Sequence, residues 1–467
     1  MRLRSIVLVA GATGATVGGG ALLGASLARH AQIKEEQTAP AVLPLSRRAD
    51  PSVDRYTFTE AAKTAASAMT DAQEAIATTW DPFVAYDSDP RVSRYVRGWA
   101  KRPPVSVYVN ATGVLASGNG VRLREASRWL VRKAGAQVKV DGWAMLDIRQ
   151  PAARQWWLYG ADGKASCQPD PADRATLDLL ACGYTGLWID NVLTRPAQWF
   201  KPDPGIDDAS WGAGLVALLS ELREAAGDDV PLVINAHWTD LAFPSAGSPT
   251  LDPASPFVQL AAEADQLVVE GGAIDPGLHY AAEGDTAWSY RRLLRFADAM
   301  HTAGARLQWE KTDSSGLTSA DASTLGAIPN CRDSDYPGRA QPVWGRGGEI
   351  WIGHVRTAAF NAATAYLTFE HGDGVGDMCE YPSRGWRGYG ADLGTPLAPR
   401  TDSGTAITRQ FADGFVAVNP GNDRLVISLP QGKRGINLAS AAMVEDDRVA
   451  TRFRMGPRSA LVVRYSR

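Results

Sequence analysis

Cysteine and histidine are scarce in this sequence. Its 467 residues include four cysteines and six histidines, and no two cysteines form a CxxC pair. Zinc centres need closely spaced cysteine or histidine ligands, and catalytic metal sites usually combine several histidines with a carboxylate. The scattered positions of these residues predict a protein with no metal and no other cofactor, and they argue against a metal-dependent deacetylase.

Several well-known motifs are also missing. The chain has no GxSxG elbow, no P-loop, no HExxH helix and no GxGxxG turn before a helix. The sequence therefore gives no support to the enzyme classes that depend on those motifs. The segment Gly372–Asp377 has the composition of a calcium loop, but it lacks the full ligand spacing and the closing glutamate. We interpret it as a flexible loop.

An excess of charge of one sign is absent as well. The chain has 48 basic and 51 acidic residues, for a formal net charge of −3. That balance offers no positive field for nucleic acid or for an anionic membrane surface, and we expect neither partner. The hydrophobic fraction of 45% suits a globular chain with a sizeable core. Fifteen tryptophans are unusually many, and aromatic faces can stack on sugar rings as well as pack in cores.

Long apolar runs are missing except at the N-terminus. Arg2 and Arg4 precede an uncharged stretch from Ser5 to Ala28, which ends in the small-x-Ala form of a signal peptidase site. We expect residues 1–28 to be a signal peptide or, because the stretch is long enough to span a bilayer, an N-terminal anchor. In either case the protein is predicted to be exported, as a secreted, extracellular or cell-surface protein that meets a membrane only through this anchor.

Export permits disulfide bonds. The order of the cysteines suggests the pairs Cys167–Cys182 and Cys331–Cys379. Four cysteines allow three pairings, however, and the sequence does not choose among them.

The rest of the chain divides into three segments that differ in composition and in the pattern of apolar and polar residues. Residues 29–57 are polar and contain proline, which is typical of a linker. Residues 58–400 alternate between strand-like and helix-like patterns, which predicts an α/β domain with a parallel sheet. Residues 401–467 consist of short alternating segments broken by turn residues, which is typical of a small C-terminal all-β sandwich.

Eight strand-like runs match the count of a TIM (β/α)8 barrel. The helix expected at Ser210–Ala226 carries leucines at the i, i+3, i+4 and i+7 positions from Leu215, as a helix packed on a sheet does. A doubly wound open sheet is the competing architecture, but it usually has a Gly-rich turn after its first strand, and none appears. The expected strands are Phe83–Tyr86, Val105–Asn110, Trp143–Asp147, Gly186–Asp190, Pro231–Asn235, Gln266–Glu270, Arg306–Glu310 and Ala365–Phe369.

Three of these runs have a similar form and end in a carboxylate. They end at Asp190, Glu270 and Glu310. In a barrel of parallel strands, the residue just past the C-terminal end of a strand points into the catalytic mouth. A carboxylate that faces an apolar interior is costly unless it is paired, hydrogen-bonded or functional.

Glycoside hydrolysis uses two carboxyl groups, one to protonate the leaving oxygen and one to attack the anomeric carbon or to activate water. We predict Asp190 as the nucleophile or general base and Glu270 as the general acid. Glu310 is a second candidate for the acid, or a substrate ligand. The structural alternatives are a helix cap at Asp190 and ion pairs of these carboxylates with Arg149, Arg195 or Lys311.

Other residues near the strand ends are candidates for substrate binding. A sugar hydroxyl both donates and accepts hydrogen bonds, and amide or carboxylate side chains can match it. A lone histidine is also often structural. Trp188 and Trp309 are interpreted as facing the helix layer, because they alternate with the carboxylates. The predicted substrate-binding residues are Asn110, Asp147, Asn191, Asn235, His237 and Trp238.

The sequence around Asp190 resembles a known family. The run Gly186-Leu187-Trp188-Ile189-Asp190-Asn191 is similar to the strand-four motif of TIM-barrel glycoside hydrolases, and the nearest group is hypothetical glycosyl hydrolase family fifteen. Endo-polygalactosaminidase-like barrels are more distant. The resemblance implies a barrel followed by a sandwich, glycosidase activity, and Asp190 as a catalytic carboxylate, with a weaker match at Glu270. It continues through Val268–Gly271, Ala391–Pro396 and Arg409–Pro420.

The sequence therefore predicts a secreted glycoside hydrolase that cleaves an extracellular or cell-wall polysaccharide with a carboxylate pair at the barrel mouth. The alternative is a non-catalytic carbohydrate-binding or cell-surface barrel that has lost its acid. The two differ in whether a second carboxylate lies within about 5 to 10 Å of Asp190.

Overall fold

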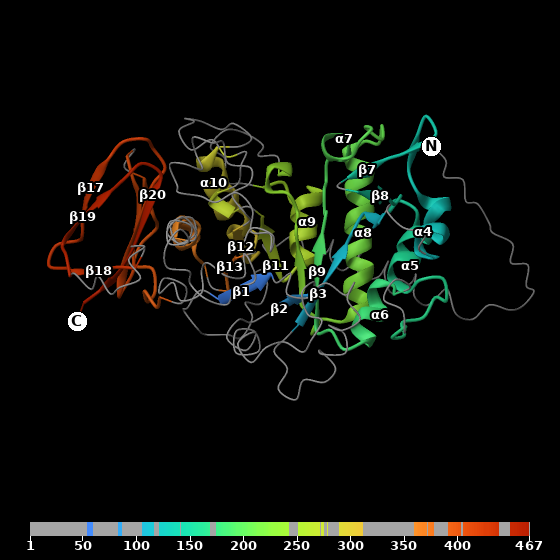
Figure 1. The fold of residues 1–467 in the computed structure, drawn as a ribbon, viewed down its shortest axis with the longest axis horizontal. Helices are drawn as coiled ribbons and strands as arrows, with labels where there is room; N and C mark the ends of the chain where they lie inside the picture. The colour runs from blue at the N-terminus through green and yellow to red at the C-terminus, as the bar shows by residue number, and fades with distance from the viewer. Residues whose placement is uncertain are drawn as a thin grey trace, which may run out of the picture. The chain divides into compact units, whose positions relative to one another are not determined.

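The structure is a computed structural model, and it describes a large part of the chain (Figure 1). The predicted signal peptide or anchor and the predicted Cys331–Cys379 disulfide lie outside the described residues. Within them, no helix is both long enough and apolar enough to cross a bilayer. The described residues are 54–58, 83–85, 105–115, 121–140, 142–168, 174–241, 251–270, 272–274, 278, 289–311, 359–370, 372–377, 391–402, 405–438 and 449–466.

Eight parallel strands close into a barrel, in the order β1-β13-β12-β11-β10-β9-β3-β2. Parallel neighbours need a crossover connection, and helices α8 (Asp208–Ala226), α9 (Pro256–Glu263) and α10 (Tyr290–Thr302) lie in three of these crossovers. The predicted α/β class with a parallel sheet is confirmed. The barrel strands are β1 (Asp54–Phe58), β2 (Phe83–Ala85), β3 (Val105–Asn110), β9 (Gly186–Asp190), β10 (Leu232–Ile234), β11 (Gln266–Val269), β12 (Leu307–Lys311) and β13 (Gly374–Asp377).

The outer face of the sheet packs on helices. Leu187 and Ile189 of β9 belong to the same buried cluster as the leucine stripe of α8 that begins at Leu215. Burying one such leucine stabilises the fold by about 1.5–3 kcal/mol. Asp207 caps α8 by accepting a hydrogen bond from the Ser210 amide at 2.8 Å. The other helices are α4 (Val121–Ala126), η2 (Ser127–Trp129), α5 (Pro151–Tyr159), α6 (Thr176–Ala181), α7 (Pro196–Trp199), η4 (Trp238–Asp240) and η5 (Gly272–Ile274).

The predicted barrel strand Trp143–Asp147 is wrong. This run forms β8, which pairs antiparallel with β4 and β7 in a separate sheet. Val140 and Trp143 are partners across Asp141-Gly142, and Gly142 has a φ of 83°. Asp-Gly between two short apolar runs is a hairpin signal, which the strand pattern alone did not reveal. The strands are β4 (Gly113–Leu115), β7 (Lys139–Val140) and β8 (Trp143–Met145), and β5 (Arg132–Lys133) with β6 (Ala136–Gln137) forms another hairpin.

The predicted strand Ala365–Phe369 is also wrong. Residues 359–368 are helical, and every residue from 359 to 369 is buried. The polar residues Asn361, Thr364 and Thr368 have the i, i+3, i+7 spacing of a helix, but the short run 365–369 considered alone fits a buried strand equally well. The barrel strand is instead β13, which lies in the Gly372–Asp377 segment interpreted as a flexible loop. Its pairing with β12 and β1 holds this glycine-rich segment extended.

The barrel begins earlier than predicted. Strand β1 pairs in parallel with β13 and β2, and its residues 54–57 fall within the expected linker. The predicted boundary after residue 57 is therefore wrong. The segment carries alternating Tyr56 and Phe58, but its neighbours Asp50-Pro51 gave it the composition of a linker.

The C-terminal part of the chain is all-β. Strands β14, β15, β16, β20 and β18 form a five-stranded sheet, and β17 and β19 form a two-stranded sheet. Along β16 and β20 the side chains alternate between two buried clusters. Phe415 and Val463 join the inner residues of β17 and β19 in one cluster, whereas Val416 and Val462 belong to the large cluster of the barrel. The strands are β14 (Thr401–Asp402), β15 (Ile407–Gln410), β16 (Gly414–Asn419), β17 (Leu425–Ser428), β18 (Gly435–Asn437), β19 (Arg452–Met455) and β20 (Ser459–Tyr465).

Arg409 of β15 ties this sheet to the end of helix 359–368. Its guanidinium donates to the backbone carbonyl oxygens of Tyr366, Leu367 and Phe369 at 3.2, 3.2 and 2.9 Å. The last carbonyl groups of a helix have no partner within the helix. Arg409 therefore supplies a donor to three buried carbonyl groups at this helix end, of which that of Tyr366 also accepts from the Phe369 amide at 3.4 Å.

The predicted disulfide Cys167–Cys182 is confirmed. Its two Cα atoms are 4.7 Å apart. Cys182 ends α6 and is buried, so the bond holds the loop before α6 against the helix.

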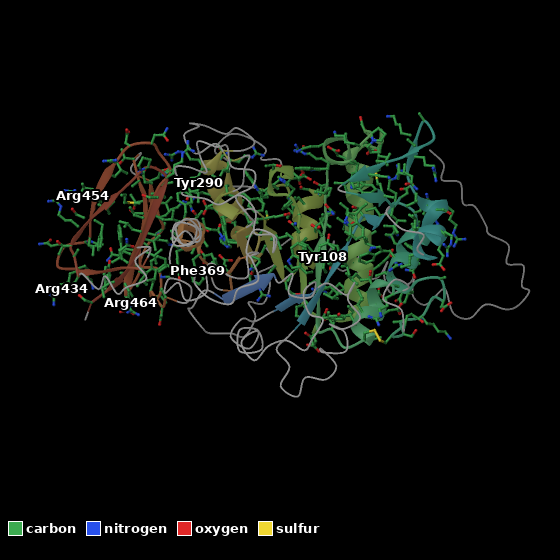
Figure 2. All side chains as sticks on the ribbon, viewed as in Figure 1. Tyr108, Tyr290, Phe369, Arg434, Arg454 and Arg464 are labelled. Atoms are coloured by element: carbon green, nitrogen blue, oxygen red, sulfur yellow. A yellow bond between two sulfur atoms is a disulfide. The ribbon has the colours of Figure 1, made fainter. Side chains whose placement is uncertain are left out.

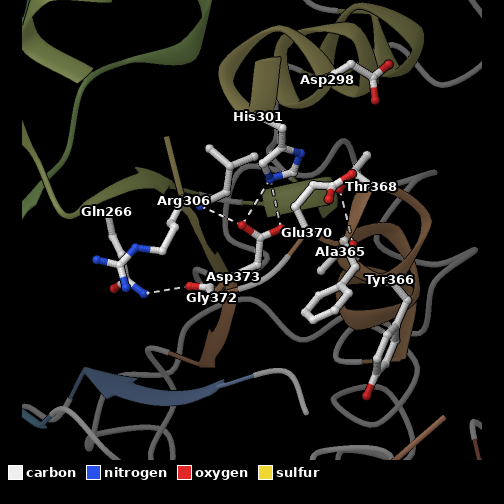
Figure 3. A network of polar contacts seen from close by, with 12 residues as sticks. Gln266, Asp298, His301, Arg306, Ala365, Tyr366, Thr368, Glu370, Gly372 and Asp373 are labelled. Atoms are coloured by element: carbon white, nitrogen blue, oxygen red, sulfur yellow. Dashed lines mark hydrogen bonds and ion pairs between the residues drawn. The ribbon is translucent and has the colours of Figure 1, made fainter. Parts of the chain in front are cut away.

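A buried ion pair lies between the C-terminal end of α10 and the start of β12 (Figure 3). The Asp373 carboxylate is 2.9 Å from His301 Nε2 and accepts hydrogen bonds from the backbone amides of Leu307 and Glu370. Burial lowers the pKa of His301, but the charge of Asp373 and the hydrogen bond to it outweigh burial and raise that pKa above its ordinary value. Asp373 therefore joins three segments at the N-terminal side of the barrel strands.

This pair makes stability depend on pH. Because the pKa of His301 is raised in the folded state, the stabilisation is fully present below pH about 6.5 and is lost as the pH rises through the raised pKa. We expect His301→Gln to cost more unfolding free energy at pH 5.5 than at pH 8.5, because the variant loses the charged partner of Asp373 that the wild type has at the lower pH. Urea denaturation at the two pH values measures the difference, and an equal cost at both would contradict it.

Candidate functional site

Asp190 lies at the C-terminal end of β9 and accepts hydrogen bonds on both of its oxygens. Oδ1 accepts from the backbone amide of Asn191 at 2.8 Å and from Asn235 Nδ2 at 3.0 Å. Oδ2 accepts from the hydroxyl of Tyr108 at 2.6 Å. Asn191 follows with a φ of 56°, a left-handed conformation that asparagine tolerates. These donors fix the carboxylate in place.

Glu270 directly follows β11 and comes close to Asp190. Asn235 Nδ2 donates to Glu270 Oε2 at 2.5 Å and to Asp190 Oδ1 at 3.0 Å. The two carboxylate oxygens that share this nitrogen are therefore at most about 5.5 Å apart, which is compatible with the separation of about 5–5.5 Å between the carboxyl groups of retaining glycosidases. Glu270 is exposed, whereas Asn235 is buried and Asp190 is half-buried. Strands four, five and six of the prediction thus bring three of the predicted site residues together.

Asn110 is next to Asp190 across the β3–β9 pair. Its side-chain oxygen accepts from the Thr112 amide at 3.1 Å, and its backbone oxygen accepts from Trp157 Nε1 at 2.8 Å. The side chain is 5% exposed, and its Nδ2 has no hydrogen-bond partner among the described residues. A buried amide donor beside the carboxylate pair is therefore left for another acceptor.

Two predicted substrate-binding residues lie elsewhere. Asp147 follows β8, outside the barrel, and pairs with Arg149 through both oxygens at 2.7 and 3.0 Å. Burial raises the pKa of Asp147, but its hydrogen bonds with Arg149 and Gln150 lower it by more. Trp238 is 2% exposed and packs against Phe296, so its ring face is not accessible. The substrate-binding prediction is therefore wrong for Trp238, and Asp147 forms an ion pair with Arg149 outside the barrel.

Glu310 lies in β12, where its Cα is paired with that of Gly376. Its side chain lies outside the described part of the structure. Its role as a second acid or substrate ligand stays a prediction.

Tyr108 was not predicted as a site residue, and Trp188 was predicted to face the helix layer. Tyr108 lies two residues before Asn110, and Trp188 two residues before Asp190, so each shares the inward face with the polar residue that ends its strand. The two rings stack at 5.6 Å, and Figure 2 labels Tyr108. The strand period of two would have found both. Trp309 does face the helix layer, since it belongs to the large buried cluster.

Asp240 holds the two loops beside the site together. Its carboxylate accepts from the Thr194 amide at 2.8 Å and from Trp199 Nε1 at 2.9 Å, which joins the segment after β9 to the one after β10. Burial raises the pKa of Asp240, and the hydrogen bonds from Trp199 and Thr194 oppose that shift. No motif in the sequence pointed to this residue.

His237 lies in the same pair of loops. Its ring is 4.2 Å from that of Trp199, centre to centre, and its Nδ1 is 2.7 Å from the Thr239 hydroxyl. Burial lowers the pKa of His237 to about 4. The imidazole is therefore neutral near pH 7 and cannot serve as a proton donor there. Among the described residues, no group of three or more His, Cys, Asp or Glu side chains could hold a metal ion.

Comparisons with known proteins do not show a family. No family model and no curated protein matches the chain. Among solved structures, the glycoside hydrolase domain of PelA from Pseudomonas aeruginosa is 14% identical, with 55% of this chain and 82% of that one covered and a TM-score of 0.32. An Anoxybacillus alpha-amylase is 10% identical, with 80% and 78% covered and a TM-score of 0.40. The isomalto-dextranase of Arthrobacter globiformis T6 is 12% identical, with 89% and 72% covered and a TM-score of 0.42.

These TM-scores are too low to carry an argument about activity. The resemblance to hypothetical glycosyl hydrolase family fifteen stays a prediction. What the chain can do is therefore argued from the contacts of Asp190, Asn235 and Glu270 described above.

The lowered pKa of His237 has a measurable consequence. The unfolded chain protonates this histidine near pH 6.5 and the folded chain only near pH 4, so stability is lost as the pH falls between these values, by up to about 3 kcal/mol. We expect the ring resonances of His237 not to titrate between pH 5 and 8 in an NMR titration. His301, whose pKa is raised, is the internal control. A midpoint near 6.5 for His237 would contradict the prediction.

Proposed function

We propose that the protein is a retaining glycoside hydrolase built on a (β/α)8 barrel with a C-terminal β-sandwich. The observation that carries the proposal is the sharing of one amide nitrogen, Asn235 Nδ2, by Asp190 and Glu270. That arrangement supports a carboxyl separation suited to direct attack on the anomeric carbon, with no room for an intervening water.

Asp190 is assigned as the nucleophile. The hydrogen bonds on both of its oxygens stabilise the negative charge and hold the side chain still. Oδ2 is the attacking oxygen, because its donors are the Tyr108 hydroxyl and, at 3.4 Å, Asn191 Nδ2, and side-chain donors can turn away more easily than a backbone amide. Attack forms a glycosyl ester with Asp190 and releases the leaving group.

Glu270 is assigned as the acid and then the base. It is exposed, so it can exchange a proton with solvent between the two half-reactions. In the first it protonates the glycosidic oxygen as the bond to the anomeric carbon breaks. In the second it takes a proton from the water that hydrolyses the ester.

The neighbouring amides are assigned to the sugar. Asn110 Nδ2 is buried without a partner among the described residues, which supports its donation to a substrate hydroxyl beside the reacting carbon. The predicted export and the family resemblance together favour an extracellular or cell-wall polysaccharide as the substrate. Membership of hypothetical glycosyl hydrolase family fifteen is part of this proposal.

Hydrolysis of a polysaccharide and cell-wall panel tests the two roles. We expect Asp190→Asn and Glu270→Gln each to lower the rate by about 10²–10⁴-fold, since each removes a group that acts in the transition state. Asp147→Asn is the matched control, because this carboxylate also follows a strand but pairs with Arg149. It should keep the wild-type rate to within a few-fold.

The outcomes separate the alternatives. Loss with Asp190→Asn alone would move the acid to Glu310. A wild-type protein that is inert on every substrate but retained by one of them would favour a non-catalytic carbohydrate-binding barrel over the enzyme.

The stereochemistry of the product tests the carboxyl separation. A double displacement at Asp190 keeps the anomeric configuration of the substrate. ¹H NMR of the first minutes of hydrolysis should therefore show the anomer of the starting linkage. An inverted product would assign Asp190 as a general base and refute the nucleophile.

A further inference from the structure

The small net charge of the chain conceals an uneven distribution. Residues 401–467 contain ten basic and six acidic residues, so this all-β segment carries a charge of +4. Since the whole chain carries −3, the remaining residues carry −7. A charge asymmetry of this kind between parts of a chain points to a partner of the opposite sign.

The arginines of the two parts also differ in their partners. In the barrel part, Arg149, Arg154 and Arg223 each pair with a carboxylate within 3 Å. In the C-terminal sheets, Arg424, Arg452 and Arg454 are exposed and have no carboxylate within 4 Å among the described residues. An exposed arginine without a carboxylate partner adds little to the stability of the fold, and its charge is available to a ligand.

Three of these arginines lie on one face of the β17–β19 sheet, which we call the arginine face. In β17 the residues Leu425 and Ile427 face the buried cluster, so Val426 and Ser428 point outward. In β19 Phe453 and Met455 face inward, so Arg452 and Arg454 point outward. The arginine face consists of Arg424, Val426, Ser428, Arg452 and Arg454.

The strand register places these residues side by side. Arg454 is the cross-strand partner of Val426, and Arg452 is the partner of Ser428. Two residues along a strand span about 6.6–6.8 Å, so Arg452 and Arg454 present guanidinium groups in a row. Arg424 directly precedes β17 on the same face, and Figure 2 labels Arg454 at the outer sheet.

We propose that the arginine face binds an acidic polysaccharide. A guanidinium group matches the geometry of a carboxylate with two parallel hydrogen bonds, and a row of them suits a polymer with repeated carboxylates. Val426, 56% exposed in the middle of the face, offers an apolar contact for the carbon-bound hydrogens of a sugar ring. This inference rests on charge and register in the C-terminal sheets, so it does not depend on the proposed hydrolysis.

An anionic membrane is a second polyanion that could be considered. The arginine face lacks the side chains that membrane binding requires. Proteins that lie on membranes insert large apolar or aromatic side chains below the headgroups. The arginine face has one exposed valine and no exposed aromatic residue. Its outward side chains suit a ligand that lies along the sheet.

Binding of the full chain to polygalacturonate tests the proposal. The measurement uses the Asp190→Asn background, so that loss of binding and loss of hydrolysis cannot be confused. We expect affinity electrophoresis to show retention by polygalacturonate, none by neutral dextran, and weakening as NaCl rises from 50 to 500 mM. Arg452→Gln with Arg454→Gln should weaken binding about tenfold. The matched control, Arg132→Gln with Lys133→Gln, removes two exposed cations from β5 and should change it less than twofold.

Three results would overturn the proposal. They are no retention of the wild type, equal weakening by both double variants, and binding to phosphatidylglycerol vesicles without binding to polygalacturonate. Circular dichroism of both double variants checks that they fold, and exposed positions of this kind usually tolerate such changes within about 0.5 kcal/mol.

Discussion

One side-chain amide lies between the two carboxylates of the barrel mouth, and the geometry of the site depends on it. Two negative charges about 5 Å apart repel each other, and each loses solvation as the site is covered. Asn235 offsets both the repulsion and the lost solvation, because its NH₂ group has two hydrogens and donates one to each carboxylate. Its own position is fixed by the backbone: its amide donates to the Ile189 carbonyl at 2.7 Å, and its carbonyl accepts from the Val192 amide at 3.1 Å. The β9–β10 pairing thus fixes Asn235 beside Asp190, and the β10–β11 pairing brings Glu270 to the same amide.

Polar contacts between side chains of different segments also hold the loops around the two carboxylates. Asp240 collects the Thr194 amide and the Trp199 indole, and His237 packs on the same Trp199 ring. Asp240 is buried and His237 is half-buried, and each has a partner from another loop. Because an unpaired buried polar group is costly, such contacts hold the loops in one arrangement. A rigid rim suits a site in which two oxygens must keep a fixed separation from a sugar carbon.

The sequence predicted the barrel strands wherever a short apolar run ended in a polar residue. Asp190, Asn235 and Glu270 were found in this way because the C-terminal ends of parallel strands meet at one edge. The same pattern failed at Trp143–Asp147, where the partner is a hairpin strand. The prediction at Ala365–Phe369, a run that does not end in a polar residue, failed because the run is the last part of a helix that is buried on all sides. Burial by distant segments decides those two cases, and a single sequence does not contain that information in local form.

The site residues likewise divide into those that were predictable from the sequence and those that were not. The strand-end carboxylates were predictable from position. Tyr108 and Trp188 were predictable from the period of two, but Tyr108 was not considered and Trp188, two residues before Asp190, was assigned to the wrong face. Asp240 was not, because its function comes from the Thr194 and Trp199 donors of another loop. The β13 strand was hidden by its own composition, since glycine-rich segments are held extended by their neighbours more than by propensity.

Strands β16 and β20 contribute alternate side chains to two separate buried clusters, and Arg409 in the adjacent strand holds three carbonyl groups at the end of helix 359–368. Removal of the C-terminal sheet would therefore take valines out of the large buried cluster. It would also take the Arg409 guanidinium away from the end of helix 359–368. Unfolding should therefore be cooperative. Neither the barrel nor the C-terminal sheet is stable without the other, so heat or denaturant should unfold residues 54–466 in one step. A C-terminal truncation then amounts to a lesion of the barrel itself, even though it removes no residue of the mouth.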